Sequence, residues 1–159
     1  MTDLARNLAS VQERIGAAAR RAERDPGEVT LVAVTKTQPY GVIQAAYNLG
    51  VRDFGENRVD EAEGKVDELP DDIVWHMIGH IQSRKAKHVV PIFQVVHSVD
   101  KTKIAERLNR EIDEGSGPLP ILLECNVSGE GSKYGIAVDK WQTDRTQRAA
   151  LWSTVEDIL

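Results

Sequence analysis

The sequence predicts an α/β fold built from a parallel sheet, and three observations support this class. Short apolar runs alternate five times with longer segments in which apolar residues recur every three or four positions. Such alternation indicates βαβ units with right-handed crossovers. Polar residues follow each apolar run, at the strand ends where α/β folds keep their ligands. Two architectures fit this pattern: a doubly wound open sheet, or part of a (β/α)8 barrel.

The bulk composition is that of one ordinary globular domain, expected to span residues 1–159. The net charge of -5 gives no electrostatic case for nucleic acid or an anionic membrane as the main partner. Cys125 is the single cysteine, which indicates a reducing compartment, and we expect it to be a small core residue. Residues 1–20 lack the apolar region of a signal peptide, and no run approaches the ~20 residues of a membrane span. We therefore expect a cytoplasmic protein.

The first elements are a leading helix and one strand–helix unit. Residues 3–24 have apolar side chains at helical spacing, and Asp25-Pro26-Gly27 should end that helix. Residues 29–35 form an apolar run typical of a buried strand. Pro39 opens a helix over residues 39–49, which Gly50 terminates.

The later elements repeat this unit four times. Each apolar run of strand length is followed by an amphipathic segment, and a glycine- and proline-containing turn over residues 115–120 precedes the fifth strand. The predicted pairs of strand and helix are 51–54 with 58–69, 73–78 with 83–90, 93–96 with 101–114, and 121–127 with 139–159.

Five groups of polar residues follow the five predicted strands, and parallel strands would bring them to one edge of the sheet. In chain order they are Lys36, Glu56 with Asn57, Gly79 with His80, Ser98 to Asp100, and Asn126 to Ser128.

Lys36 ends an apolar strand, and strand alternation places it on the same face as Val32 and Val34. An unpaired lysine is costly to bury. It would therefore either extend to solvent, or be desolvated and react as a free amine, as Schiff-base formation with an aldehyde requires. The strand pattern by itself leaves both interpretations open.

The other candidate residues also have two interpretations each. Asn57 would either cap the following helix or hydrogen-bond a ligand. His76 lies within a strand, where the four residues to His80 span roughly 13 Å, so the two do not form a metal site and His76 is expected in the core. Lys133, in the glycine-rich stretch 126–135, could contact a phosphate, although the spacing is that of neither a P-loop nor a dinucleotide site.

Five ordered motifs resemble those of the pyridoxal phosphate homeostasis proteins, whose fold is similar to the N-terminal barrel of alanine racemase. The motifs are "AVTKTQP", "FGENRVDEAEGK", "WHMIGHIQSRKAK", "HSVD" and "LLECNVSGEGSKYGI", and the resemblance covers residues 4–136. It implies an incomplete (β/α)8 TIM-type barrel with about five parallel strands and an N-terminal helix.

The resemblance also implies roles for four residues. Lys36 would hold pyridoxal 5'-phosphate as a Schiff base, Asn57 would line the cofactor, and His76 and Lys133 would lie near the barrel mouth. The family is regarded as a carrier or regulator of the free cofactor without established catalysis, so pyridoxal-phosphate enzymes lacking their cofactor are expected partners. A racemase-type enzyme is the alternative, but its second acid/base would come from a further domain.

The sequence differs from the resembled family in length. Family members continue through three more strands, and their late segment supplies groups that bind the cofactor phosphate. A barrel of this type needs eight strands, so the chain is expected to be truncated at its C-terminal side. An open edge would then favour self-association. A truncated fragment that no longer binds the cofactor is a further alternative.

Overall fold

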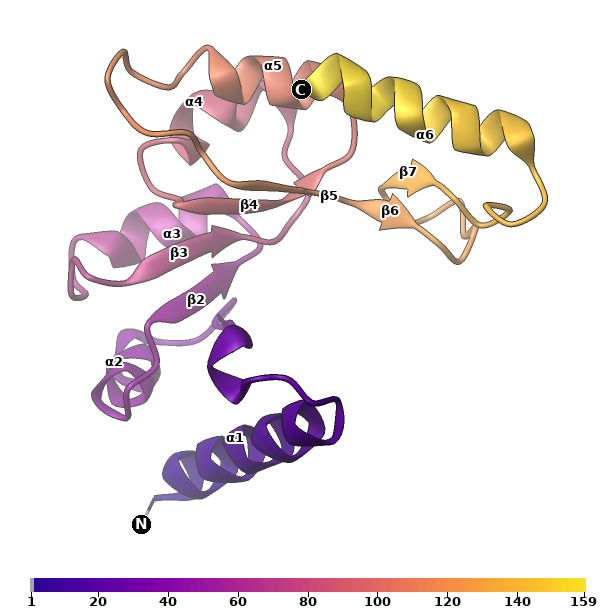
Figure 1. Ribbon diagram of the computed structural model, residues 1–159. Helices are drawn as coiled ribbons and strands as arrows, with labels where there is room; N and C mark the ends of the chain where they lie inside the picture. The colour runs from indigo at the N-terminus through magenta and orange to yellow at the C-terminus, as the bar shows by residue number, and fades with distance from the viewer. Residues whose placement is uncertain (1) are drawn as a thin grey trace.

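A computed structural model describes residues 2–159 of the protein, and its central feature is a five-stranded parallel sheet (Figure 1). The strands pair strictly in chain order. A doubly wound sheet would instead reverse its strand order at a switch point. The sheet therefore has the topology of a barrel segment, and the partial-barrel expectation is confirmed. The strands are β1 (Ala33–Val34), β2 (Asp53–Glu56), β3 (Val74–Met77), β4 (Val95–Val99) and β5 (Ile121–Leu123).

Helices connect the strands, and a small second sheet follows them. The α-helices are α1 (Asp3–Arg21), α2 (Tyr40–Asn48), α3 (Val59–Val66), α4 (Ala86–Val89), α5 (Thr102–Asn109) and α6 (Arg145–Ile158). Two short 3-10 helices are η1 (Pro26–Glu28) and η2 (Ser83–Lys85). The second sheet pairs β6 (Cys125–Asn126) with β7 (Ile136–Ala137) in parallel. Helix α6 packs against α5 and β7, beyond the fifth strand (Figure 1).

The hydrophobic core lies between the strands and helices α2 to α5. Phe54 and Trp75 contribute the largest strand side chains, with ring centroids 6.0 Å apart. Ile43, Ala62 and Ile104 contribute to the same core from the helices. Burying these apolar side chains provides the main stabilisation of the fold.

The opposite face of the sheet corresponds to the inside of a barrel, and it is partly open. Val34 and Leu122 point away from the helix layer and are 51% and 49% exposed. His76 and His97 lie on this face, and their rings contact each other. Three polar side chains of the middle strands, those of Asp53, His76 and His97, therefore lie on the face that a closed barrel would enclose.

Several predicted boundaries are wrong, and local contacts explain the differences. Only residues 33–34 of the strand predicted over 29–35 pair with β2. The last helix begins after Asp144, whose carboxylate accepts hydrogen bonds from the first free amides of α6. The strand predicted over 121–127 is interrupted at Glu124 and continues as β6, which pairs with β7, a strand absent from the sequence prediction.

Cys125 is exposed, so its expected place in the core is wrong. It lies in β6, beyond the five-stranded sheet, where the helix layer does not cover it.

Between residues 2 and 159, each helix is either too short or too polar to cross a membrane.

Candidate functional site

Lys36 lies in the turn that follows β1, and its side chain is exposed. The desolvation suggested by its apolar strand neighbours is therefore wrong for this structure. The reason is geometric: β1 ends at Val34, and the chain turns at residues 36–37 before the helix layer covers it. Of the two interpretations, the structure supports the first: the side chain extends to solvent, where a ligand can also reach the amine.

Asn57 lies near Lys36 at the same edge of the sheet. Val34 pairs with Gly55, and each candidate residue is two positions beyond this pair on neighbouring strands. Of the two interpretations of Asn57, the capping role is wrong, because Arg58 is the N-cap residue of α3 and its cap has no side-chain hydrogen bond. The half-buried Asn57 side chain is thus available at the strand end, beside the turn that carries Lys36.

Gly79 packs unusually close to the backbone of Asn57. A Cβ atom built on Gly79 would lie 2.1 Å from the Asn57 carbonyl oxygen, which is far inside van der Waals contact. The Gly79 carbonyl in turn accepts a 2.6 Å hydrogen bond from the Ser98 hydroxyl. The ends of β2, β3 and β4 are therefore drawn together, and only glycine permits this approach.

The backbone of the Lys36 turn is held by helix α3. The Lys65 ammonium donates to the Thr35 carbonyl at 3.0 Å, and the Thr37 amide donates to Glu61 Oε2 at 3.1 Å. Thr37 has φ 62°, a left-handed conformation that is strained for a β-branched residue. Contacts on both sides of Lys36 therefore maintain a turn that the local sequence disfavours.

Glu56 does not lie at the mouth of the barrel as the sequence suggested. It points into the helix layer, where it is 0% exposed and forms a 2.7 Å ion pair with Lys65. Its Oε1 also accepts a 2.8 Å hydrogen bond from the Thr35 hydroxyl. Strand alternation explains this placement, since Glu56 shares a face with the core residue Phe54.

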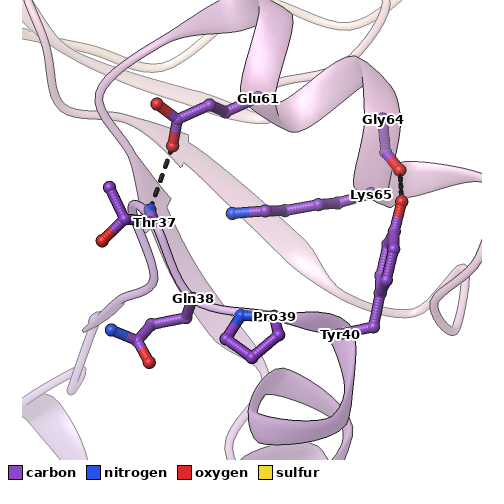
Figure 2. Close-up of a pocket in the computed structure, with 7 residues that line it drawn as sticks. All are labelled: Thr37, Gln38, Pro39, Tyr40, Glu61, Gly64 and Lys65. Atoms are coloured by element: carbon purple, nitrogen blue, oxygen red, sulfur yellow. Dashed lines mark hydrogen bonds between the residues drawn. The ribbon is translucent and has the colours of Figure 1, made fainter.

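A cavity of about 380 Å³ lies between α3 and the turn that carries Lys36. Figure 2 shows Lys65 and Glu61 reaching from α3 toward the turn, with Thr37 at the end of the Glu61 hydrogen bond. The Tyr40 hydroxyl closes one side by donating to the Gly64 carbonyl. This cavity lies on the helix side of the turn and is lined by the residues that hold it.

His76 is buried in the middle of β3, with its ring on the inner face of the sheet. One ring nitrogen lies 2.9 Å from Asp53 Oδ1, and the other lies 2.8 Å from His97 Nε2. Because the carboxylate only accepts, His76 Nε2 donates to Asp53. When His76 is neutral, its Nδ1 then accepts from His97 Nε2. From Asp53 on β2 through His76 on β3 to His97 on β4, each residue lies two positions beyond the register partner of the one before it.

The stability of the protein should fall below about pH 6.5 partly because of His97. Burial, together with the neighbouring His76, lowers the pKa of His97. The unfolded chain then binds this proton more readily than the folded protein, so stability is lost as pH falls from the unfolded pKa toward the lower folded one. Urea unfolding between about pH 5 and 7.5 should show a smaller pH dependence for His97→Gln than for wild type. An equal reduction in His88→Gln, which alters an exposed histidine, would contradict this origin.

Lys133 lies in the glycine-rich loop after β6, which belongs to the small second sheet and not to the five-stranded sheet that contains β1. Its ammonium forms a 2.6 Å ion pair with Glu130, and both side chains are about half exposed. The Asn126 side chain organises the loop, accepting from the Gly129 amide and donating to the Glu130 carbonyl. The structure therefore does not bring Lys133 next to Lys36 through any contact within residues 2–159.

Tyr134 connects this loop to the end of β3. Its ring stacks on His80 with centroids 3.7 Å apart and planes 9° apart. His80 Nδ1 in turn lies 3.8 Å from Asp100 Oδ2 at the end of β4. The loop that carries Lys133 is thus drawn over the carboxyl ends of the middle strands.

Sequence reasoning missed Lys65, Glu61 and the Asp53–His97 ends of the histidine network. The i, i+4 spacing of Glu61 and Lys65 places them on one face of α3 and was a usable signal. The matching parity of Asp53, His76 and His97 on successive strands was another.

The sequence and the fold correspond to one known family. The family model described as the alanine racemase N-terminal domain matches residues 6–153. The chain belongs to this family. An alanine racemase structure from E. faecalis aligns over 93% of the chain with a TM-score of 0.55 at 17% identity, which supports the shared fold.

The similar curated proteins bear a more specific name. A pyridoxal phosphate homeostasis protein of Pseudomonas aeruginosa is 49% identical over 138 residues, which is 86% of this chain and 60% of that protein. Its counterpart in Escherichia coli is 42% identical over 140 residues, with the same coverage. The resemblance stated from the five motifs is therefore confirmed. The chain spans about 60% of the length of these relatives.

Solved structures of a further protein, PipY, are also similar to this chain. PipY of Synechococcus elongatus, with pyridoxal phosphate bound, is 35% identical and has a TM-score of 0.68. The alignment covers 96% of this chain and 65% of PipY. PipY without the cofactor aligns over 96% of this chain with a TM-score of 0.72.

Proposed function

We propose that the protein binds pyridoxal 5'-phosphate and takes part in its homeostasis, with Lys36 as the covalent anchor. The observation that carries this proposal is the placement of Lys36, an exposed amine at the carboxyl end of the first strand, beside Asn57. Ligand sites of barrel folds lie at this edge. The relatives named for this cofactor, and PipY with the cofactor bound, add independent support.

The residues present suit an aldehyde cofactor. The Lys36 amine would condense with the aldehyde, forming a Schiff base and releasing water. Asn57 offers an amide that can donate or accept at the neighbouring strand end. Gly79 lets the backbone ends of β2 and β3 approach each other closely beneath this position. Lys36 would therefore supply the covalent bond, and Asn57 would orient the bound ring.

We place Lys133 as a contact for the phosphate, which requires it to leave Glu130. Both side chains are exposed, and an exposed ion pair is worth only about 0–1 kcal/mol, so the exchange costs little. Lys133→Gln should then weaken binding of pyridoxal phosphate and leave binding of pyridoxal unchanged. Equal effects on the two aldehydes would remove Lys133 from the phosphate site.

A titration with pyridoxal phosphate tests the covalent anchor. Addition of the cofactor should produce an imine absorbance band, and borohydride reduction followed by peptide mapping should place the adduct on Lys36. Lys36→Ala should lose the band entirely while retaining the far-UV circular dichroism of wild type, because Lys36 is exposed and outside the core. An adduct distributed over several surface lysines would refute the assignment of the site.

We further propose that the protein carries the cofactor without turning over a substrate, and that apo pyridoxal-phosphate enzymes receive it. The rival function is that of a racemase, since the alanine racemase fold is shared. Racemisation of alanine by the loaded protein should not exceed that by free cofactor. Sustained turnover that disappears with Lys36→Ala would instead establish the enzyme.

Self-association through the open side of the sheet is part of the proposed behaviour of this chain. Val34 and Leu122 are about half exposed on the inner face, and Val127 is 73% exposed near the edge. Exposed apolar surface of this kind favours association. Sedimentation velocity across a concentration series would test it, and a constant monomer mass would exclude it.

A further inference from the structure

The two peptide groups that flank Lys36 are both held by side chains of one helix. The peptide carbonyl before Lys36, that of Thr35, accepts from the Lys65 ammonium at 3.0 Å. The peptide amide after Lys36, that of Thr37, donates to Glu61 Oε2 at 3.1 Å. Because the two peptide planes adjoining a Cα atom define its φ and ψ, these two bonds fix the backbone of Lys36.

The positions of Glu61 and Lys65 on α3 allow both side chains to reach the turn at the same time. They are four residues apart on α3, so their side chains emerge from the same face of the helix. Lys65 is anchored by its 2.7 Å ion pair with the fully buried Glu56. Hydrogen bonds that involve an ionised group are shorter and stronger than neutral ones. The turn is therefore held by hydrogen bonds to two charged side chains, and α3 orients both of them.

The turn would not keep this conformation without such contacts. Thr37 has φ 62°, in the left-handed region, where a β-branched side chain is disfavoured by about 1–2 kcal/mol. Strained backbone of this kind persists only where the surroundings determine it, and it gathers at functional sites. The Glu61 bond acts directly on the strained residue.

We propose that Glu61 and Lys65 are positioning residues that present the Lys36 amine to an aldehyde. This inference deepens the proposed function and rests on it. Neither residue needs to touch the cofactor, since each acts through a peptide group next to Lys36. Fixing the turn before binding lowers the conformational entropy that binding would otherwise lose. Loss of either contact should therefore weaken imine formation more than it weakens the fold.

Glu61 gives the clearer test because its side chain is 29% exposed and its removal leaves no deeply buried charge. Glu61→Ala removes the acceptor for the Thr37 amide, whereas Glu61→Gln keeps a carbonyl oxygen in its place. Glu63→Ala is the matched control, since Glu63 is on the same helix but pairs with His88. Thr37→Gly is a second variant, because glycine adopts the left-handed conformation without strain yet leaves the turn freer.

Two measurements should be made on wild type and on the four variants. The first is the apparent dissociation constant of the imine with pyridoxal phosphate. The second is the hydrogen-exchange rate of the amide at position 37, which reports on the turn with no cofactor present. In Glu61→Ala we expect the apparent dissociation constant of the imine to rise about tenfold, in keeping with the loss of one charge-assisted hydrogen bond. The amide at position 37 should also exchange faster than in wild type. Glu61→Gln should recover most of both values, and Glu63→Ala should match wild type.

For Thr37→Gly, the urea concentration at the midpoint of unfolding should be at least that of wild type. The variant should nevertheless bind the cofactor more weakly than wild type. Wild-type affinity and exchange in Glu61→Ala, or an equal loss in Glu63→Ala, would overturn the positioning role. Absence of an imine on Lys36 in wild type would refute the proposed function instead. The exchange rates would then still decide whether Glu61 fixes the turn.

Discussion

Replacing Lys65 with methionine should lower the free energy of unfolding by about 3–5 kcal/mol, the typical cost of breaking a buried ion pair from one side. Glu56 is 0% exposed, and its carboxylate would remain buried without its countercharge. For a chain of this size, each 1 kcal/mol shifts the thermal midpoint by roughly 2–4 °C. Urea denaturation and thermal unfolding followed by circular dichroism would both detect a loss of this size.

A double variant separates the buried charge from the missing contact. Lys65→Met combined with Glu56→Gln removes both charges, so most of the lost stability should return. Glutamine at position 56 can still accept from the Thr35 hydroxyl. If Lys65 positions Lys36, the double variant should remain impaired in imine formation despite its recovered stability. If the double variant recovered both its stability and its imine formation, Lys65 would have a purely structural role.

Lys85→Met is the matched control for this prediction. Lys85 forms an ion pair of the same length, 2.7 Å, with Asp60, but the two side chains are 37% and 54% exposed. Exposed pairs contribute about 0–1 kcal/mol. A loss in Lys85→Met as large as that in Lys65→Met would show that burial is not the deciding factor.

Gly79→Ala should destabilise the protein by about 1–3 kcal/mol or more, as overpacking does elsewhere, and should also weaken cofactor binding. The new methyl group would lie 2.1 Å from the Asn57 carbonyl oxygen and 2.8 Å from the Asn57 Cα atom. These are backbone atoms, so no side chain can rotate away to make room. The ends of β2 and β3 must separate, which displaces Asn57 from its place beside Lys36. Urea unfolding and cofactor titration would measure the two effects.

Gly41→Ala provides the control for the glycine substitution. Gly41 lies in α2, and a Cβ atom there would meet nothing within 4 Å. Alanine is favoured over glycine in helices by about 1 kcal/mol, so this variant should be as stable as wild type or more stable. A wild-type midpoint in Gly79→Ala would mean that the strand ends can move apart freely, and that they do not hold Asn57 in place.

The sequence by itself determined the class of fold and the position of its principal candidate residue. Alternating strand and helix patterns are local, and each depends on side chains only a few residues apart. Lys36 could be placed at a strand end because the apolar run stops there. Its proposed role as a covalent anchor, however, came from the resemblance of five motifs, since one lysine after a strand has several explanations.

The tertiary structure decided which architecture the elements form and what surrounds Lys36. Strand order is set by long-range pairing, and the sequential order β1 to β5 distinguishes a barrel segment from a doubly wound sheet. Glu56 was placed at the barrel mouth from its position in the chain, yet it points into the helix layer and pairs with Lys65. The hydrogen bonds that hold the turn join Glu61 to Thr37 and Lys65 to Thr35, which are 24 and 30 positions apart in the chain. A sequence pattern cannot specify such contacts, because they depend on how α3 packs against the end of β1.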